Sequence, residues 1–106
     1  MNKIVYNAYY GGFSLSEEAV LLARKLSENS EDWMRVDTKY GYIYDNISRH
    51  DKILVAVVEQ LGDLASGRCA KLRIFNTNSK RYMIEEYDGF ESVRVGYDED
   101  EWTYIS

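Results

Sequence analysis

Apolar positions repeat at helical spacing in two stretches of the chain. The first stripe lies in residues 18–26 and consists of Ala19, Leu22, Ala23 and Leu26. The second is broader and consists of Ile53, Leu54, Val57, Val58 and Leu61. This spacing is typical of helices that bury one side against a core. The pattern therefore predicts two amphipathic helices.

The residues that flank these stripes are typical of helix ends. Ser14 and Glu17 fit a capping box, in which the serine accepts from a backbone N–H and the glutamate reaches back to the cap. Asp51 is the expected N-cap of the second helix. Gly62 fits a glycine C-cap, although the following residues could instead prolong the helix to Gly67.

The other segments favour extended structure. Stretches rich in β-formers, some of them alternating, occur at residues 3–9, 70–75, 81–87, 90–95 and 102–105. Asp88-Gly89 predicts a tight hairpin turn, since a type I′ turn needs positive φ at both central residues. Residues 33–44 are expected to form short extended segments.

These elements predict an α+β fold. The expected architecture is an antiparallel sheet, made of the N-terminal strand and a C-terminal β-meander, with two helices packed on one face. Its 106 residues, 45% of them hydrophobic, suit a single domain over residues 1–106.

Composition narrows the functional class. No apolar run reaches the roughly 18 residues of a membrane span, and no signal pattern opens the chain. One cysteine fits a reducing compartment, so the cytoplasm is the expected location. The formal net charge of −5, with acids gathered at residues 98–101, argues against general nucleic-acid binding.

Candidate catalytic chemistry is sparse. A nucleophilic dyad would need His50, the single histidine, to meet Cys69, the single cysteine. The favoured alternative makes Cys69 a small apolar residue that opens a buried strand, with His50 at a helix entry. Without a second histidine or cysteine we expect no metal site, no cofactor and no enzymatic activity.

Three segments could receive an anion such as phosphate. The first runs through two glycines into a helix start, which exposes backbone amides, and consists of Tyr9, Tyr10, Gly11, Gly12, Phe13 and Ser14. The same glycines could serve only a tight turn. The second contains Arg49 and His50 just before the second helix, where both could equally be solvated.

The third segment is Ser66-Gly67-Arg68, followed by Lys71 and Arg73. A helix C-cap leading into a solvated basic face is the alternative here. The chain also has ten tyrosines and no proline. If two of the three segments converge, neighbouring tyrosines could stack on the bases of a nucleotide.

Four of these motifs carry a resemblance. YGGFSLS at residues 10–16, RHD at 49–51 leading into LVAVVEQLG at 54–62, ASG at 65–67 and EYDG at 86–89 resemble a family of small uncharacterised bacteriophage proteins. The match covers about residues 3–95. It does not include residues 33–44 or the acidic tail.

The resemblance implies a viral protein similar to the immune-evasion sponges that sequester cyclic nucleotide signals of bacterial defence systems such as CBASS or Thoeris. Such proteins bind without turnover in the host cytoplasm and are generally homo-oligomers. The implied contacts are Arg49, His50, Arg68 and residues 9–14. One alternative is an acidic, DNA-mimicking inhibitor of a host defence enzyme that uses residues 98–101. Another is a small enzyme with His50 as general acid or base.

Overall fold

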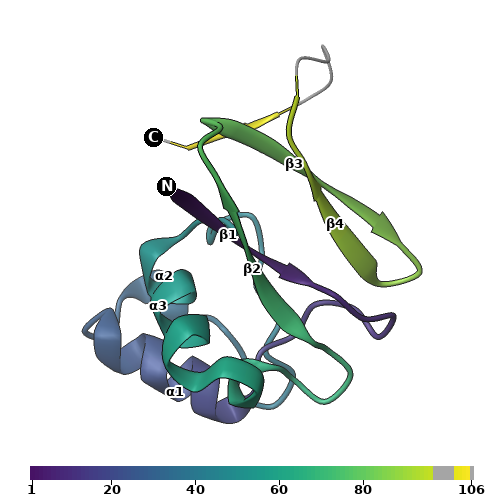
Figure 1. Cartoon of the computed structure of the whole chain (residues 1–106). Helices are drawn as coiled ribbons and strands as arrows, with labels where there is room; N and C mark the ends of the chain where they lie inside the picture. Colours follow the sequence, from purple (N-terminus) through teal and green to yellow (C-terminus); the bar gives the residue numbers. More distant parts are fainter. Residues whose placement is uncertain (97–101, 106) are drawn as a thin grey trace.

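The structure, a computed structural model, describes residues 1–96 and 102–105 (Figure 1). Its helical elements are α1 (Glu17–Leu26), α2 (Glu31–Met34), α3 (Lys52–Leu61) and the 3-10 turn η1 (Gly62–Ala65). Its strands are β1 (Asn2–Asn7), β2 (Leu72–Thr77), β3 (Arg81–Tyr87), β4 (Phe90–Arg94) and β5 (Thr103–Tyr104). Among the described residues, no helix is both long and apolar enough to cross a membrane.

The predicted α+β class with antiparallel strands is confirmed, but the strands form two sheets. β1 pairs with β2, in a register that runs from Asn2 opposite Thr77 to Asn7 opposite Leu72. β3 lies between β4 and β5 in the second sheet. Among the described residues, β2 and β3 are therefore not partners, so the predicted C-terminal meander is interrupted after β2. β2 pairs with the N-terminal strand, whereas β3 and β4 form a hairpin.

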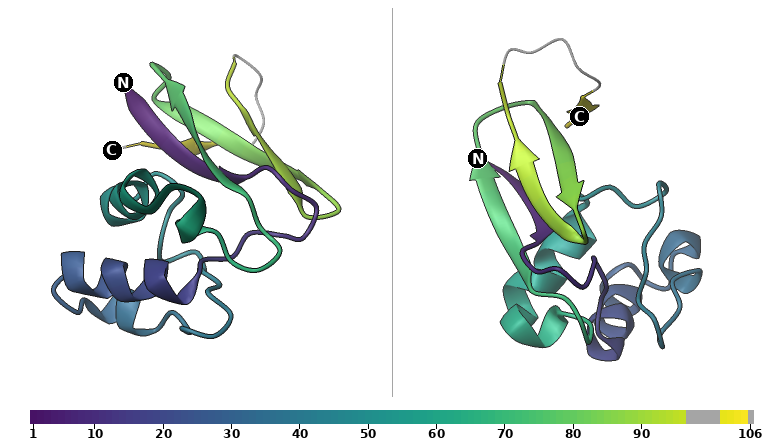
Figure 2. Two further views of the ribbon diagram at one scale, coloured as in Figure 1. Left: turned by 60° about the horizontal axis from the view of Figure 1, so that its bottom comes forward. Right: turned by 90° about the vertical axis from the view of Figure 1, so that its right-hand side faces the viewer.

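The β1–β2 sheet lies between the helices and the β3–β4 hairpin (Figure 2). α3 contacts both strands of this sheet, and α1 packs against α3. Ile4 and Val5 are neighbours on β1 and so point to opposite faces, yet both are fully buried. β1 is thus covered on both sides, which makes it the central strand of the molecule.

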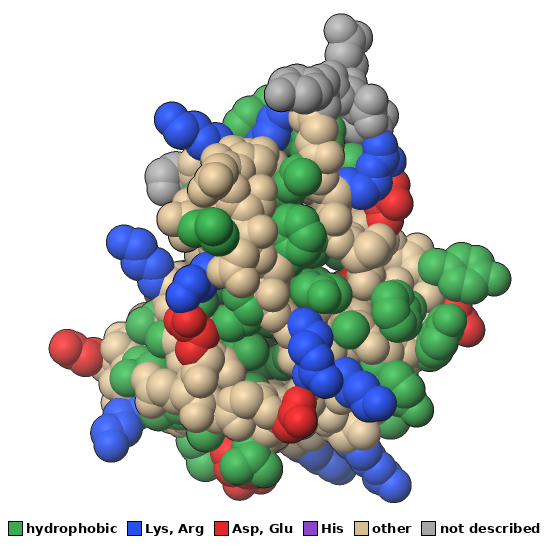
Figure 3. Space-filling view, viewed as in Figure 1, with side chains coloured by type: hydrophobic (Ala, Val, Ile, Leu, Met, Phe, Trp, Pro, Cys, Tyr) green, Lys and Arg blue, Asp and Glu red, His purple; other side chains and the backbone are tan. Residues whose placement is uncertain are grey.

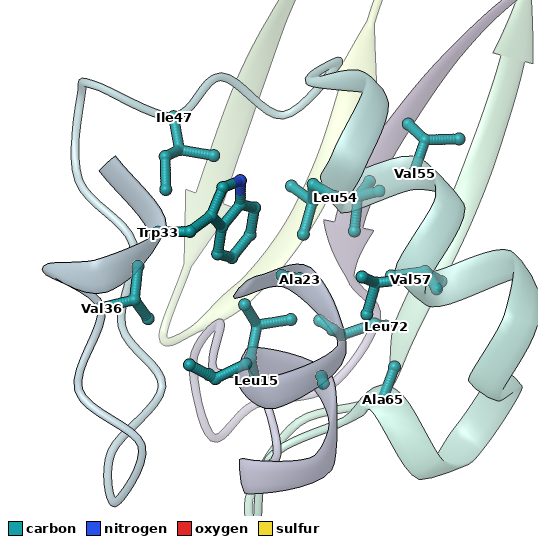
Figure 4. Packing of buried hydrophobic residues seen from close by; sticks show 14 of the residues in the cluster. Leu15, Ala23, Trp33, Val36, Ile47, Leu54, Val55, Val57, Ala65 and Leu72 are labelled. Atoms are coloured by element: carbon teal, nitrogen blue, oxygen red, sulfur yellow. The ribbon is translucent and has the colours of Figure 1, made fainter. Parts of the chain in front are cut away.

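The apolar core on the helical side joins all three helices to the first sheet (Figure 4). α2 places Trp33 in this core, near Ile47 and Leu54, and leaves only 2% of it exposed. The prediction of extended segments in residues 33–44 is wrong, since the stretch begins in α2 and continues as turns and loop. Trp33 and Val36 anchor the start of this stretch in the core.

The predicted caps of α3 are confirmed, but the predicted N-cap of α1 is wrong. Asp51 caps α3 by accepting from the Leu54 N–H at 3.0 Å, and Gly62 ends α3 with a φ of 57°, as predicted. α1 is capped by Ser16, which accepts from the Ala19 N–H, and not by Ser14. Ser14 is buried instead, and its carbonyl accepts from the Gly67 N–H at 2.9 Å.

An ion pair closes the outer edge of β1. The Arg49 guanidinium donates two hydrogen bonds to Glu91 of β4, at 2.5 and 2.7 Å. The same carboxylate accepts from the Asn7 N–H at 2.9 Å, and the Val5 N–H donates to the Arg49 carbonyl at 2.8 Å. These contacts take the place of the backbone hydrogen bonds that a neighbouring strand would provide to β1. We call this arrangement the seam between the two sheets.

Asn7 completes the seam at the end of β1. Its side chain is fully buried and donates to the carbonyls of Tyr9 and Gly89, at 2.8 and 2.9 Å. Its amide oxygen accepts from the Lys71 N–H at 2.8 Å. The predicted hairpin turn is confirmed, with Asp88 at φ 51° and Gly89 at φ 87°. One asparagine therefore joins the β1 exit, the β3–β4 turn and the start of β2.

The seam predicts a large stability effect for Glu91→Gln. Removing one charge of a buried, hydrogen-bonded ion pair leaves the other charge uncompensated, at a cost of about 3–5 kcal/mol. Glu59→Gln is the matched control, because its pair with Lys3 is about half exposed and such pairs contribute about 1 kcal/mol or less. Urea denaturation would measure both variants. Equal losses of unfolding free energy would contradict this account of the seam.

Candidate functional site

Residues 14–16 act as a short middle strand between two other segments. The Ser16 N–H donates to the Ala65 carbonyl and the Gly67 N–H donates to the Ser14 carbonyl, both at 2.9 Å. On the other side, the Leu15 N–H donates to the Gly41 carbonyl at 2.8 Å. Three segments that are far apart in the sequence are therefore fixed side by side through their backbones.

Gly67 makes this approach possible. A Cβ atom at this position would lie 2.1 Å from the Ser14 Oγ and 2.8 Å from its Cβ. No side chain fits there without displacing the 14–16 segment. The glycine at position 67 is thus explained by close packing against Ser14.

A cavity of about 590 Å³ lies where the three segments meet. We call it the hollow, and it is lined by Gly11 and by residues 14–17, 38–40, 42 and 66–69. Small-molecule sites typically have volumes of about 300–1,000 Å³. The hollow therefore has room for a ligand of nucleotide size.

The hollow brings cations and hydroxyl groups together. Lys39 and Arg68 are exposed in its walls, and the serine and threonine residues of the lining are Ser14, Ser16, Thr38 and Ser66. Two of these hydroxyls already have partners, since Ser16 donates to the Leu64 carbonyl and Ser66 accepts from the Leu72 N–H. Glu17 is the acidic residue in the lining. Guanidinium, ammonium and hydroxyl donors are the groups that bind phosphate oxygens.

The first and third predicted anion segments converge here, in part. Gly11 and Ser14 line the hollow together with Arg68, but Lys71 does not. Lys71 places its ammonium 4.6 Å from the centre of the Tyr9 ring. This cation–aromatic contact lies outside the hollow.

The remaining residues of the first segment also make their contacts outside the hollow. Tyr10 packs on Phe90 with ring centres 5.2 Å apart, and Gly12 adopts a φ of 89°. The Phe13 ring lies under the Arg49 guanidinium, 3.9 Å from its centre. None of these residues lines the hollow, so the predicted segment is divided between two surfaces.

The second predicted segment does not join the hollow. Arg49 is occupied by Glu91 and by Phe13, so the guanidinium that was expected to hold a ligand holds the seam instead. His50 lines a different cavity, of about 470 Å³, at the start of α3. Its Nδ1 lies 2.7 Å from the hydroxyl of Tyr82, which is 2% exposed.

The environment of this pair fixes its protonation. Burial raises the pKa of Tyr82 to about 12, against smaller opposing effects of the Arg49 charge and of backbone hydrogen bonds from Arg49 and His50. The phenol therefore keeps its proton at neutral pH and can donate it to Nδ1. Burial also lowers the pKa of His50, and the nearby Asp51 carboxylate partly offsets that shift. Burial of the ring and a hydrogen bond from the phenol to Nδ1 both favour a neutral imidazole.

Cys69 differs from its expected role. It is exposed and lines the hollow, because β2 begins at Leu72 and residue 69 lies in the loop before it. His50 and Cys69 therefore line separate cavities and form no dyad. Within residues 1–96 and 102–105, no group of three or more His, Cys, Asp or Glu side chains is placed to hold a metal ion.

Sequence reasoning missed the loop that supplies Lys39, Tyr40 and Tyr42 to the hollow. It lies in residues 33–44, which were interpreted as extended. The available signal was two tyrosines on either side of a glycine, directly after a lysine. No known protein family, curated protein or solved structure matches the chain.

The lowered pKa of His50 predicts a pH-dependent stability. The unfolded chain, with a histidine pKa near 6.5, binds more protons than the folded chain between the two pKa values. The contribution of neutral His50 to the unfolding free energy is therefore fully present above about pH 6.5 and is lost as the pH falls below that value. We expect the unfolding free energy of the protein to fall more than that of His50→Gln between about pH 7.5 and about pH 5.5. Parallel pH profiles for the two proteins would contradict the assignment.

Proposed function

We propose that this protein captures a small phosphorylated ligand in the hollow and holds it without turnover. The observation that carries the proposal is the meeting of Arg68 and Lys39 with the hydroxyl-bearing segments at 14–16 and 66–67, in a cavity of suitable volume. The resemblance to small bacteriophage proteins puts the cyclic nucleotide signals of bacterial defence first among the ligands to test. In that role the protein is a sponge that lowers the free concentration of the signal.

The position of His50 argues against the alternative in which it is the general acid or base of an enzyme. His50 is separated from the hollow, with one ring nitrogen bonded to Tyr82. A general base must lie within hydrogen-bond reach of the proton it removes. The alternative of an acidic inhibitor depends on residues 98–101, which lie outside the described residues.

The first test is thermal stability of the protein against a panel of cyclic nucleotides, with recovery of the ligand afterwards. A ligand at 100 times its dissociation constant adds about 2.7 kcal/mol of stability, which raises the melting temperature visibly. A selective shift with intact ligand supports capture. A hydrolysed product would support an enzyme, and no shift with any phosphorylated ligand would contradict the proposal.

Arg68→Ala is expected to weaken binding of whichever nucleotide gives the shift. Loss of a charged hydrogen bond costs about 1.5–3 kcal/mol, which is about 10- to 150-fold in the dissociation constant. Arg35→Ala is the control, because Arg35 is an exposed arginine that pairs with Glu31 outside the hollow. Isothermal titration calorimetry would compare the two. Equal affinity of both variants would show that the ligand binds elsewhere.

We also propose that the chain forms a homodimer through an aromatic patch made of Tyr9, Tyr10, Tyr87 and Phe90. These side chains are exposed, and Tyr87 is 79% exposed. Hydrophobic side chains project at the right-hand edge of the molecule, where the β3–β4 hairpin ends (Figure 3). Exposed aromatic side chains on a rigid frame are typical of interfaces.

Charge around the patch favours a second copy as the partner. Lys71 lies beside Tyr9, whereas Asp88 follows Tyr87 in the hairpin turn. In a two-fold dimer each patch meets its own copy in reversed orientation. The basic side of one protomer would then face the acidic side of the other.

Tyr87→Ser is expected to weaken this dimer, and Tyr44→Ser, which changes another highly exposed tyrosine outside the patch, is expected to leave it intact. Loss of an aromatic anchor from an interface costs about 2 kcal/mol or more, which is about 30-fold in the dimer dissociation constant. Sedimentation equilibrium would measure both. A parent protein that sediments as a monomer at every concentration would rule out the dimer.

A further inference from the structure

The loop that brings aromatic rings to the hollow has a defined conformation. The Asp37 carboxylate accepts from the backbone N–H groups of Lys39 and Tyr40, at 2.6 and 3.0 Å. The Asp37 carbonyl accepts from the Gly41 N–H at 2.8 Å. A short side chain that satisfies two backbone donors in this way closes a turn. The loop is therefore held by its own hydrogen bonds.

Gly41 fixes this turn to the rest of the molecule. Its carbonyl accepts from the Leu15 N–H, and its φ is 66°. A Cβ atom at position 41 would lie 1.9 Å from the Leu15 carbonyl oxygen, so any other residue would push the loop away. The side chains on either side of Gly41 thus project from a fixed point at the wall of the hollow.

Those side chains are Tyr40 and Tyr42, and their rings are stacked. The ring centres are 6.1 Å apart and the planes differ by only 5°. Both residues line the hollow, and about half of each side chain is exposed. Lys39 lies over the Tyr40 ring, 5.2 Å from its centre. Among the described residues the Tyr42 ring has no other ring or cation contact than Tyr40, so it is the open end of the stack.

A flat aromatic surface of this kind binds another planar ring. Base stacking on an aromatic side chain is tolerant of base identity, because every base has a π-face. Arg68 lies in another wall of the same hollow, where it can receive a charged group. One cavity therefore offers a ring surface and an anion-binding cation on different walls.

We infer that Tyr42 is the base-binding residue of the hollow and that the ligand is a nucleoside phosphate, recognised through its ring as well as its phosphate. This inference rests on the proposed function, since it assigns a second contact in the same site. Sugar phosphates and inorganic phosphate would use only the cations. Their binding free energy would be smaller than that of a nucleoside phosphate by the contribution of one stacked base.

The test separates the ring from the phosphate by calorimetry with two probes, adenosine 5′-monophosphate and ribose 5-phosphate. The parent protein is expected to bind the nucleotide about 5- to 150-fold more tightly. Tyr42→Leu is expected to lose this preference and to keep its affinity for ribose 5-phosphate. Tyr42→Phe, which keeps the ring, retains the preference, and so does Tyr44→Leu, which changes an exposed tyrosine outside the hollow.

The outcomes also separate this inference from the proposed function. Equal binding of the two probes by the parent protein would overturn the role of Tyr42 and leave phosphate capture in place. The same conclusion follows if Tyr42→Leu and Tyr42→Phe behave alike. If neither probe binds the parent protein, the inference fails, and the panel of cyclic nucleotides then decides the proposed function. Because Tyr42 is half exposed, its variants are expected to fold, which thermal melting without ligand would verify.

Discussion

The Arg49–Glu91 ion pair is the contact on which the arrangement of the two sheets depends. β1 and β4 share no backbone ladder, and the outer edge of β1 would otherwise present buried N–H and C=O groups without partners. Glu91 accepts from the Asn7 N–H, and the Arg49 carbonyl accepts from the Val5 N–H. Unpaired buried backbone groups are costly, so these two residues allow β1 to be buried on both faces.

Contacts of the seam also help to position one wall of the hollow. The Arg49 guanidinium packs on Phe13, and the next residue, Ser14, begins the segment that pairs with residues 65–67. Asn7 holds the loop between β1 and α1 from its other end. The wall of the hollow formed by residues 14–17 is therefore positioned by contacts made elsewhere in the fold. Stability of the seam and geometry of the site are physically connected.

Two predicted roles changed most, and in both cases the local sequence did not show what would surround the residue in the folded protein. Arg49 was interpreted as a ligand contact and Cys69 as a buried strand residue, and the structure reverses their surroundings. Arginine is mostly exposed in proteins unless it is paired, and free cysteine is commonly buried. Glu91, the residue that pairs with Arg49, lies 42 positions away along the chain. Local sequence contains no sign of such a partner.

Most local elements of this protein can be predicted from short stretches of its sequence. Periodic apolar residues specify α1 and α3, Asp51 and Gly62 mark the ends of α3, and Asp88-Gly89 specifies the hairpin turn, because each depends on residues that are close together in the sequence. Tertiary structure decided which strands pair, which serine caps α1, and which cations meet in the hollow. Those outcomes depend on backbone approaches such as Gly67 to Ser14 and Gly41 to Leu15, between segments brought together only by burial of the common core.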